Sequence, residues 1–567
     1  MKAKEKFEKL LNKKYTPYIL IILLGIVVSI PLFTMNLSEY NEFRIHIARV
    51  TTVKEILKDG VFPPLISYKH MLTFGYALNI FYGPFTTYIP IIISIFTGST
   101  VMAIKVFTLL TVIFSGITMY WFTYKVTSKK TAALISAFIY MVAPYKFTDI
   151  YSRNAMGEYA AFIFIPMIFQ GVYELINNEK KGNYMLVIGA TLLILSHTIT
   201  TIYVVLFACL FLIFNYKKIL NWNFWKNIII DCFIILIFTS FYTIPLIEHK
   251  INGEYTIFDS DAMLATGWDA YENTNNISDW FKSELSHDEL IFSFGLAMTF
   301  LIFLTIFCLK KVDEKYKDIY TTFGVLALIS LFMCTKLFPW IAMPHFLTII
   351  QFAWRINGFF IFFISFVCGI NLYVFSNILY SIKYTILCLI SAVIFILGWL
   401  GVAKYITKYD VNVDTRFEKN LVNSKSIGPF NVNREYLPFA SDLNLGYMEK
   451  RENRTYVLKG NATIVNESKE KLKDSIQLKD VNSATLELPY LYYHGYTVTL
   501  NDEKLKPYQS DKGFICVDVN EDGDLKIGYT GTAIEKAGYV ISIGGVIITL
   551  AYIGIKKHWN LLEIVVK

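Results

Sequence analysis

Charged residues are scarce in this chain. They make up 17% of its 567 residues, whereas a soluble domain carries about 25%. Hydrophobic residues reach 54%, the mean hydropathy is +0.45, and apolar runs of about 20 residues recur along the chain. This composition excludes an ordinary soluble domain and indicates a polytopic membrane protein. The formal charge of +8 does not indicate nucleic-acid binding, because the lysines cluster between apolar runs, where membrane topology explains them.

Several motifs of soluble enzymes are also missing. There is no GxxxxGK[ST] loop, which argues against ATP hydrolysis, and no HExxH or GxSxG sequence. The cysteines form no CxxC or Cys/His spacing that would indicate a metal centre. All but Cys516 lie in apolar runs, where a thiol behaves as a small apolar group. Cys516 has no evident partner in its polar region, so we expect no disulfide there.

The apolar runs predict about twelve membrane spans. The first, 18–35, is long and lacks a small-residue cleavage site, so we expect a signal anchor that is retained. The other predicted spans are 103–123, 131–144, 157–176, 184–197, 198–215, 226–247, 289–309, 318–337, 356–377, 383–402 and 537–555. The segment 131–144 is short, and 184–197 with 198–215 could instead form one long helix and a loop.

The distribution of lysines predicts the orientation. Six lysines precede residue 15, which places the N-terminus in the cytoplasm. Alternate loops then carry further lysines: Lys125, Lys129, Lys130, Lys180, Lys181, Lys217, Lys218, Lys310, Lys311, Lys315, Lys317, Lys383, Lys556 and Lys557. The opposite loops carry the acids, histidines and arginines of interest. We therefore predict a multi-pass protein of the cell membrane whose active side is extracytoplasmic.

The predicted fold class is mainly α, a polytopic membrane helix bundle with a small β-rich domain before the last span. Residues 1–402 form the membrane domain, with a long first outer loop at 36–102. A short apolar piece within it, 88–96, is expected to be re-entrant or to lie on the surface. Residues 403–536 alternate in polarity between turn signals and form the extracytoplasmic β-rich domain. Residues 537–567 supply the last span and a cytoplasmic tail.

A first candidate cluster follows directly on the first span. In a helix, Glu42, His46 and Arg49 lie at i, i+4 and i+7 and share one face. Phe43, Ile47 and Val50 share an adjacent face, which would let the helix lie on the bilayer surface. An acid, a titratable base and a cation at the membrane boundary suit a reaction on a lipid-borne substrate. An amphipathic connector without chemistry has the same pattern.

Two further clusters lie on the predicted outer side. Arg153 and Glu158 stand at the mouth of a span, where an uncompensated charge is costly. They could pair locally and brace the loop. Alternatively, Arg153 could hold a phosphate, whose oxygens match its planar fork, while Glu158 orients it. His197 lies at the end of an apolar run, where it is either a hydrogen-bonded structural residue or part of a site.

Two more candidates occur where spans meet the outside. Glu248, followed by His249, is either a helix-end anchor or a site residue. Arg355 opens a span beside Trp354, and an aromatic belt explains the tryptophan. Snorkelling alone does not explain an arginine at an outer span end, because cations are biased inward. Arg355 is therefore a candidate for a second phosphate contact.

The chain resembles a known family through a series of short strings. These are Glu42-Phe-Arg-Ile-His46-Ile-Ala-Arg49, Gly60-Val-Phe-Pro63, Phe81-Tyr-Gly-Pro84, Tyr151-Ser-Arg153-Asn-Ala-Met-Gly-Glu158, Ser196-His197, Pro245-Leu-Ile-Glu248, Gln351-Phe-Ala-Trp-Arg355 and Tyr493-His-Gly-Tyr496. In this order and spacing they resemble the multi-span glycosyltransferases of the GT-C type, above all the YfhO-like group. Members of that group are often labelled pyruvoyl-tetrahydropterin synthase-related membrane proteins. The resemblance covers nearly the whole chain.

The resemblance implies sugar transfer outside the membrane, from a polyprenyl-phosphate sugar to a cell-envelope glycan, glycopolymer or glycoprotein. It also implies that a carboxylate of the first outer loop acts as the base. That residue is usually Asp in a His-Asp-x-x-Phe-His pattern, whereas here it would be Glu42, and Asn41 replaces the preceding His. Asn154 stands where Gly is common.

The resulting hypothesis gives Glu42 the base role and assigns the leaving phosphate to Arg153 and Arg355. His46 would orient Glu42 or contact the phosphate. The other residues assigned to substrate contact are Arg49, Glu158, His197 and Glu248. A divalent metal on Glu42 and Glu158 is compatible with the sequence but not required by it. Two alternatives are a transporter or flippase for a lipid-linked glycan, and a non-catalytic scaffold that presents the β-rich domain to cell-wall polymer.

Overall fold

The computed structural model describes residues 13–34, 42–179, 181–259, 269–281, 292–293, 295–343, 350–378, 418, 434–471 and 473–566. The chain forms two compact units, each assembled from separate stretches of sequence. Unit 1 comprises Met1–Ile47, Phe85–Cys232 and Gly267–Glu418, and unit 2 comprises Ala48–Pro84, Phe233–Thr266 and Lys419–Lys567. The predicted domain boundary at 402/403 and the predicted span 383–402 lie outside the described residues, so both stay predictions.

Unit 1 is helical. Its helices are α2 (Thr16–Thr34), α5 (Phe85–Thr97), α6 (Thr100–Thr127), α7 (Lys130–Met141), α8 (Pro144–Phe147), α9 (Met156–Ile176), α10 (Gly182–Ile194), α11 (Thr198–Phe214), α12 (Tyr216–Ile219), α15 (Gly295–Phe303), α16 (Thr305–Cys308), α17 (Glu314–Met333) and α18 (Asn357–Ile378). Two helices, α3 (Phe43–Lys58) and α13 (Trp222–Asn252), begin in unit 1 and continue into unit 2. Together with the strands described below, they confirm a mainly α chain with a C-terminal β-rich region.

Six helical segments of the described residues are long and apolar enough to cross a membrane. They are Thr16–Thr34, Thr100–Thr127, Met156–Ile176, Trp222–Asn252, Ala353–Ser376 and Ala533–Tyr552. Each coincides with a span that the sequence predicts. The predicted spans 131–144, 184–197 and 198–215 correspond to the shorter apolar helices α7, α10 and α11. The last two are separate helices rather than one long helix.

The core of unit 1 is built around α9 and α18, whose apolar stretches are the most deeply buried of these six. A group of phenylalanine rings fills the space between α6, α9, α17 and α18, with ring centroids 5.0 to 6.0 Å apart: Phe122, Phe169, Phe323, Phe362, Phe363 and Phe366. Glycine allows α18 to approach α7 closely, because a Cβ on Gly369 would lie 1.9 Å from the Ser136 Oγ.

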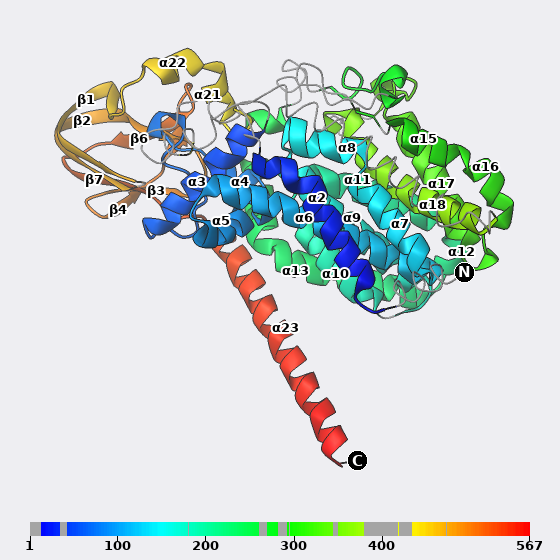
Figure 1. The fold of residues 1–567 in the computed structure, drawn as a ribbon. Coiled ribbons are helices and arrows are strands. Elements are labelled where there is room, and N and C mark those ends of the chain that lie inside the picture. Colours follow the sequence, from blue (N-terminus) through cyan, green and yellow to red (C-terminus); the bar gives the residue numbers. More distant parts are fainter. Residues whose placement is uncertain are drawn as a thin grey trace. The chain divides into compact units, whose positions relative to one another are not determined.

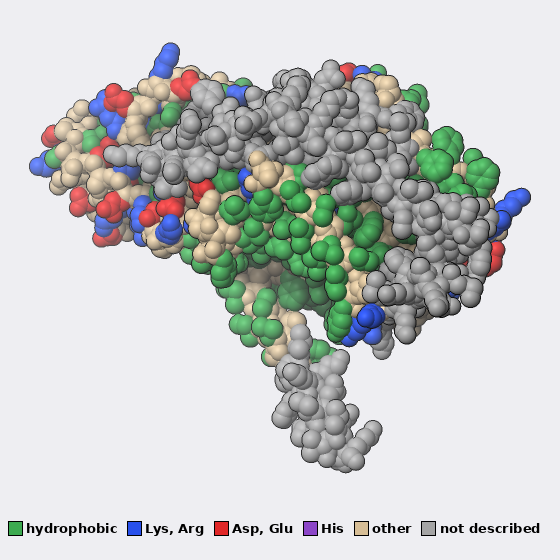
Figure 2. Space-filling model, viewed as in Figure 1, with side chains coloured by type: hydrophobic (Ala, Val, Ile, Leu, Met, Phe, Trp, Pro, Cys, Tyr) green, Lys and Arg blue, Asp and Glu red, His purple; other side chains and the backbone are tan. Residues whose placement is uncertain are grey.

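Large apolar side chains remain exposed along the outer faces of several helices. Ile19, Leu23, Ile26 and Ile30 project from α2, and Phe233 and Leu236 project from α13. Figure 2 shows hydrophobic side chains covering the helical surface, whereas Lys, Arg, Asp and Glu gather over the strands. Continuous apolar surface of this kind is costly in water and is expected to face lipid.

The described residues of unit 2 contain a seven-stranded sheet, drawn at the left of Figure 1 near α22 (Leu445–Lys450). Its strands are β1 (Tyr456–Glu470), β2 (Lys473–Leu491), β3 (Tyr496–Leu500), β4 (Glu503–Leu505), β5 (Tyr508–Gln509), β6 (Phe514–Val519) and β7 (Gly523–Tyr529). The order is β4-β3-β7-β2-β6-β5, and β1 pairs with β2. Asn501 and Asp502 adopt the left-handed conformation between β3 and β4, as the predicted turn requires. The last helix, α23 (Ala533–Val566), follows the sheet.

The prediction that one face of α3 lies on the bilayer surface is wrong. Phe43, Ile47 and Val50 are at most 2% exposed, so this apolar face is covered by protein. The helix also continues to Lys58, well beyond the polar stretch that predicted it. Amphipathicity indicates that a face is buried, but it does not identify what covers that face.

A buried ion pair stabilises the sheet of unit 2. The Arg451 Nε donates to the Glu487 Oε1 at 3.0 Å, and both side chains are almost fully buried. The guanidinium also lies 4.6 Å from the ring centre of Phe514 and 4.5 Å from that of Tyr456. Removing one partner leaves the other as an uncompensated buried charge.

We therefore expect Arg451→Leu to destabilise unit 2 by about 3–5 kcal/mol. Differential scanning calorimetry of the detergent-purified protein measures the loss as a lower Tm of the unit 2 transition. The control is Arg454→Leu, since Arg454 is exposed and pairs with the exposed Glu452; it should change stability by less than about 1 kcal/mol. Equal Tm values for the two variants would contradict a stabilising role for the buried pair.

Candidate functional site

The site is built on a single turn of π-helix, Thr148–Arg153, between α8 and α9. The turn brings Asp149 and Arg153 to the same side, and a hydrogen bond joins the Arg153 Nη1 to the Asp149 Oδ1. Asn154 ends the turn in the left-handed conformation, with φ of 55°. Asparagine is one of the few residues besides glycine that tolerate that conformation.

Glu42 is attached to this turn by both its backbone and its side chain. Its backbone N–H donates to the Arg153 carbonyl at 3.0 Å, and its Oε1 accepts from the Arg153 Nη2 at 3.0 Å. His46, one helical turn further along, places its Nε2 3.6 Å from the Glu42 Oε2. The same Nε2 accepts from the backbone N–H of Met156 at 3.3 Å. The first turn of α3 is therefore held against the start of α9.

Three carboxylates surround the guanidinium of Arg153. Besides Glu42 and Asp149, Glu158 accepts from the Arg153 Nη1 at 2.8 Å. One face of the guanidinium lies over the Trp354 ring, 4.3 Å from its centre. Only Glu42 among these acids is accessible: its side chain is 31% exposed, against 4% for Glu158 and none for Asp149. A substrate can therefore reach Glu42 but not the other two carboxylates.

Arg355 supplies a second guanidinium beside Glu158. Its Nε lies 3.7 Å from the Glu158 Oε2, and its Nη1 donates to the Gln351 Oε1 at 3.0 Å. Among the described residues its Nε has no hydrogen-bond acceptor. The Nε is buried against Glu158, but the side chain as a whole is 11% exposed, so the guanidinium can present N–H groups to an additional anion.

Four helices begin next to these side chains. Glu42 immediately precedes α3, Glu158 lies in the first turn of α9, and Arg355 lies in the 3-10 turn Ala353–Ile356 that leads into α18. His197 caps α11 and lies within the electrostatic influence of Arg355, Glu158 and Glu42. Because a helix N-terminus carries a partial positive charge, their convergence makes the local potential more favourable to an anion.

The environment drives the pKa values of two acids in opposite directions. Burial would raise the pKa of Glu42, but the neighbouring His46 and the charges of Arg153 and Arg355 hold it well below the ordinary value. Complete burial and the negative charge of Glu158 raise the pKa of Asp149 well above its ordinary value, despite Arg153. At neutral pH, Glu42 is therefore ionised, whereas the neutral form of Asp149 is favoured.

The predicted metal-binding pair, Glu42 and Glu158, is a poor donor set here. Each carboxylate uses one oxygen on the same Arg153 guanidinium, so a cation already occupies the space between them. A second cation there would be repelled by Arg153. We derive no step of the chemistry through a metal at this position.

The structure brings together Glu42, His46, Arg153, Glu158 and Arg355, and His197 lies within their electrostatic field. The other two predicted residues belong to unit 2. Arg49 is buried there with its guanidinium 3.8 Å from the centre of the Tyr82 ring, and Glu248 accepts from the Thr532 Oγ1 at 2.7 Å. The prediction omitted Asp149, Gln351 and Tyr145, whose hydroxyl donates to the Glu158 Oε1. Asp149 and Gln351 each precede an arginine by four residues, a spacing that could have indicated them.

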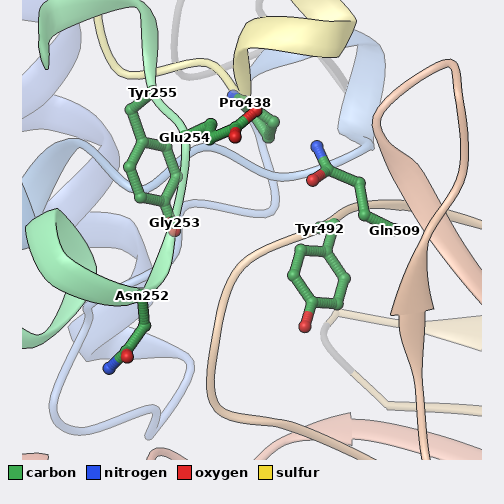
Figure 3. A pocket seen from close by; sticks show the side chains of 7 residues that line it. All are labelled: Asn252, Gly253, Glu254, Tyr255, Pro438, Tyr492 and Gln509. Carbon is green, nitrogen blue, oxygen red and sulfur yellow. The ribbon is translucent and has the colours of Figure 1, made fainter.

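Unit 2 contains a cavity of about 260 Å³. In Figure 3, Asn252 and Tyr255 lie on one side of it and Tyr492 and Gln509 on the other, with Pro438 between them. The remaining lining residues are Gly253 and Glu254. Tyrosine rings combined with amide and carboxyl groups suit a polar ligand that has both hydroxyl groups and apolar faces.

Comparison with known proteins defines the class. Residues 80–406 match the family described as "6-pyruvoyl-tetrahydropterin synthase related domain; membrane protein". This match covers more than half of the chain, so the chain belongs to that family of membrane proteins. The family resemblance and the membrane class predicted from the sequence are thereby confirmed.

A curated relative is an uncharacterized protein of Lactococcus lactis subsp. cremoris. It is 29% identical over 344 residues, which cover 57% of this chain and 54% of that protein. The chain therefore spans about half the length of this relative.

Among solved structures, the chain is similar to the oligosaccharyltransferase of Archaeoglobus fulgidus. The apo crystal structure gives a TM-score of 0.42 at 12% identity and covers 78% of this chain and 59% of that one. The structure with an inhibitory peptide and a dolichol-phosphate gives 0.39 at 11% identity, with coverage of 73% and 57%. At these scores the likeness carries no argument.

The raised pKa of Asp149 leads to a prediction about stability. Its pKa is higher in the folded than in the unfolded protein, so folding is favoured at low pH and loses that contribution as pH rises above about 4. Asp149→Asn has no such proton linkage and should therefore be at least as stable as wild type at pH 8. The altered hydrogen bond to Arg153 should cost no more than about 1 kcal/mol. The advantage should disappear toward pH 4. Thermal unfolding in detergent between pH 4 and 8 measures this dependence.

The matched variant is Glu158→Gln, which removes a carboxylate hydrogen-bonded to Arg153 and is expected to cost about 3–5 kcal/mol at pH 8. A Tm for Asp149→Asn as low as that of Glu158→Gln would show that Asp149 is ionised in the folded protein.

Proposed function

We propose that the protein is an extracytoplasmic glycosyltransferase that moves a sugar from a polyprenyl-phosphate carrier to a cell-envelope acceptor. Glu42 removes the proton from the acceptor hydroxyl, whose oxygen attacks the anomeric carbon. The bond between that carbon and the phosphate oxygen breaks, and the phosphate leaves with the electron pair. Arg153 and Arg355 hold the developing charge. A one-step displacement of this kind inverts the anomeric centre.

One observation carries the proposal. Glu42, Arg153 and Arg355 are distant in sequence, yet they lie in one cluster of unit 1, and Glu42 is its accessible carboxylate. A base must reach the proton that it removes, and the phosphate must reach donors that are not fully satisfied. The Arg355 guanidinium, whose side chain is 11% exposed, and the converging helix N-termini support an anion at this place.

The low pKa of Glu42 adds a requirement. A carboxylate held well below its ordinary pKa by Arg153 is a weak base. If Arg153 turns toward the phosphate of the bound donor, the pair with Glu42 opens and the carboxylate regains basicity. Substrate binding would then activate the base, and Glu158 and Asp149 would keep Arg153 anchored during the exchange.

Unit 1 also supports the proposed sidedness. Glu158 is in the first turn of α9, whereas Glu174, in its last turn, lies 3.5 Å from Lys125 at the end of α6. The site and the lysine-rich loops are therefore at opposite ends of a helix about 30 Å long, which matches the apolar thickness of a bilayer. With the lysines in the cytoplasm, the site faces outward.

The base role is tested with Glu42→Gln. We expect sugar transfer to fall at least about 100-fold, because the amide cannot accept the proton, whereas Glu42→Asp should keep partial activity. Membranes containing equal amounts of each variant are incubated with a panel of radiolabelled polyprenyl-phosphate sugars, and label is measured in envelope material. Glu272→Gln, an exposed acid of the same unit, is the control. Full turnover by Glu42→Gln would refute the assignment.

Arg355 is tested through its leaving-group role. Arg355→Gln should lower kcat by about 100- to 1,000-fold, because the lost donor acts on charge that develops in the transition state. Arg355→Lys should recover only part of this, since an ammonium lacks the planar fork. Lys336→Gln, which removes an exposed cation of unit 1, should leave transfer unchanged. A flippase would instead move labelled lipid across vesicles without forming product.

A further inference from the structure

Three residues with metal-binding side chains meet in unit 2. Glu248 and His249 lie in the last turn of α13, and Glu535 lies in the first turn of α23. One ligand atom from each residue lies within 4.8 Å of the others. This cluster takes no part in the function proposed above.

The hydrogen bonding of His249 is that of a typical metal-ligating histidine. Its Nδ1 lies 2.9 Å from the Pro245 carbonyl oxygen, which can only accept, so Nδ1 carries the proton. In the neutral ring the Nε2 then presents a lone pair. The side chain is fully buried, its Nε2 has no hydrogen-bond partner among the described residues, and it lies 3.8 Å from the Glu535 Oε1. In metal sites generally, the histidine nitrogen that does not bind the metal donates its N–H to an acceptor such as a backbone carbonyl. This hydrogen bond fixes the tautomer of the ring.

The two carboxylates are oriented by separate donors. The Thr532 Oγ1 donates to the Glu248 Oε2 at 2.7 Å, and the Tyr529 hydroxyl donates to the Glu535 Oε1 at 2.8 Å. The backbone N–H of Thr532 donates to the Glu535 Oε2 at 3.0 Å. Each of these oxygens keeps a second lone pair for a ligand.

The charge balance also points to a cation. Glu535 is almost completely buried, and Glu248 brings a second carboxylate to the same place. The aromatic rings of Phe81 and Tyr255 border His249, with ring centres 6.0 and 6.1 Å from its own. Two carboxylates in such an apolar setting repel each other unless one takes up a proton or a metal ion lies between them.

We propose that Glu248, His249 and Glu535 bind one divalent transition-metal ion, with zinc the best match. One imidazole and two carboxylates are ligands that zinc accepts, and three protein ligands leave a fourth position for water or another group. The ion would join the end of α13 to the start of α23. A competing arrangement has His249 protonated and paired with Glu535, and it predicts no metal binding.

The test uses the full-length protein in detergent, stripped with EDTA and titrated with Zn²⁺ by calorimetry. We expect about one equivalent of zinc per chain, with at least 10-fold weaker binding in His249→Gln and Glu535→Gln. Co²⁺ should give visible absorption bands in wild type that both variants lose. Zinc should raise the Tm of wild type but not that of the variants. If His249→Gln or Glu535→Gln does not fold, zinc binding is measured instead on Glu248→Gln, which changes a partly exposed ligand.

Two controls separate this site from other acids. Glu254→Gln changes an exposed carboxylate of the same unit, and Glu42→Gln changes the candidate base in unit 1; both should bind zinc as wild type does. Absence of saturable zinc binding by wild type would overturn the proposal. So would binding that survives in His249→Gln and Glu535→Gln but disappears in Glu42→Gln.

Discussion

Unit 1 depends on the burial of one guanidinium. Arg153 is almost inaccessible, and a cation in that position is tolerable only if anions neutralise it and acceptors satisfy its N–H groups. Three segments provide those partners: the residue before α3, the π-helical turn and the first turn of α9. Because the same carboxylates fix the ends of these segments, the electrostatic requirement of Arg153 also determines where the segments meet.

The three acidic side chains around Arg153 therefore have different roles, although their chemistry is similar. Asp149 and Glu158 are enclosed and serve the guanidinium, whereas Glu42 contacts it from the accessible side. Under the proposed function, an incoming phosphate would replace Glu42 as the partner of Arg153 without leaving the cation unpaired. The cluster therefore has a built-in exchange partner, and the carboxylate released by the exchange is the one able to reach substrate.

The sequence was sufficient to predict the helix bundle, the main strands and the types of residue at the cluster. Arg49 shows the limit of reasoning from a helical face. It shares a face with Glu42, but seven residues advance a helix by about 10 Å, so Arg49 reaches the aromatic surroundings of Tyr82 instead. The covered face at Phe43 and Ile47 shows a second limit, because local periodicity does not distinguish protein from lipid as the neighbour. Asp149 was missed because its role depends on a π-helical turn that composition does not reveal.

The close contact between Gly369 and Ser136 has a consequence at a distance. Gly369 lies twelve residues into α18, about 18 Å along the helix from its first residue, and Arg355 is attached to that end. A side chain at residue 369 would push α18 away from α7 and would thereby displace the N-terminal end of α18. Substitutions in the middle of the bundle can therefore move Arg355, and under the proposed function they would change the affinity for the lipid carrier although every residue that contacts the carrier stays the same.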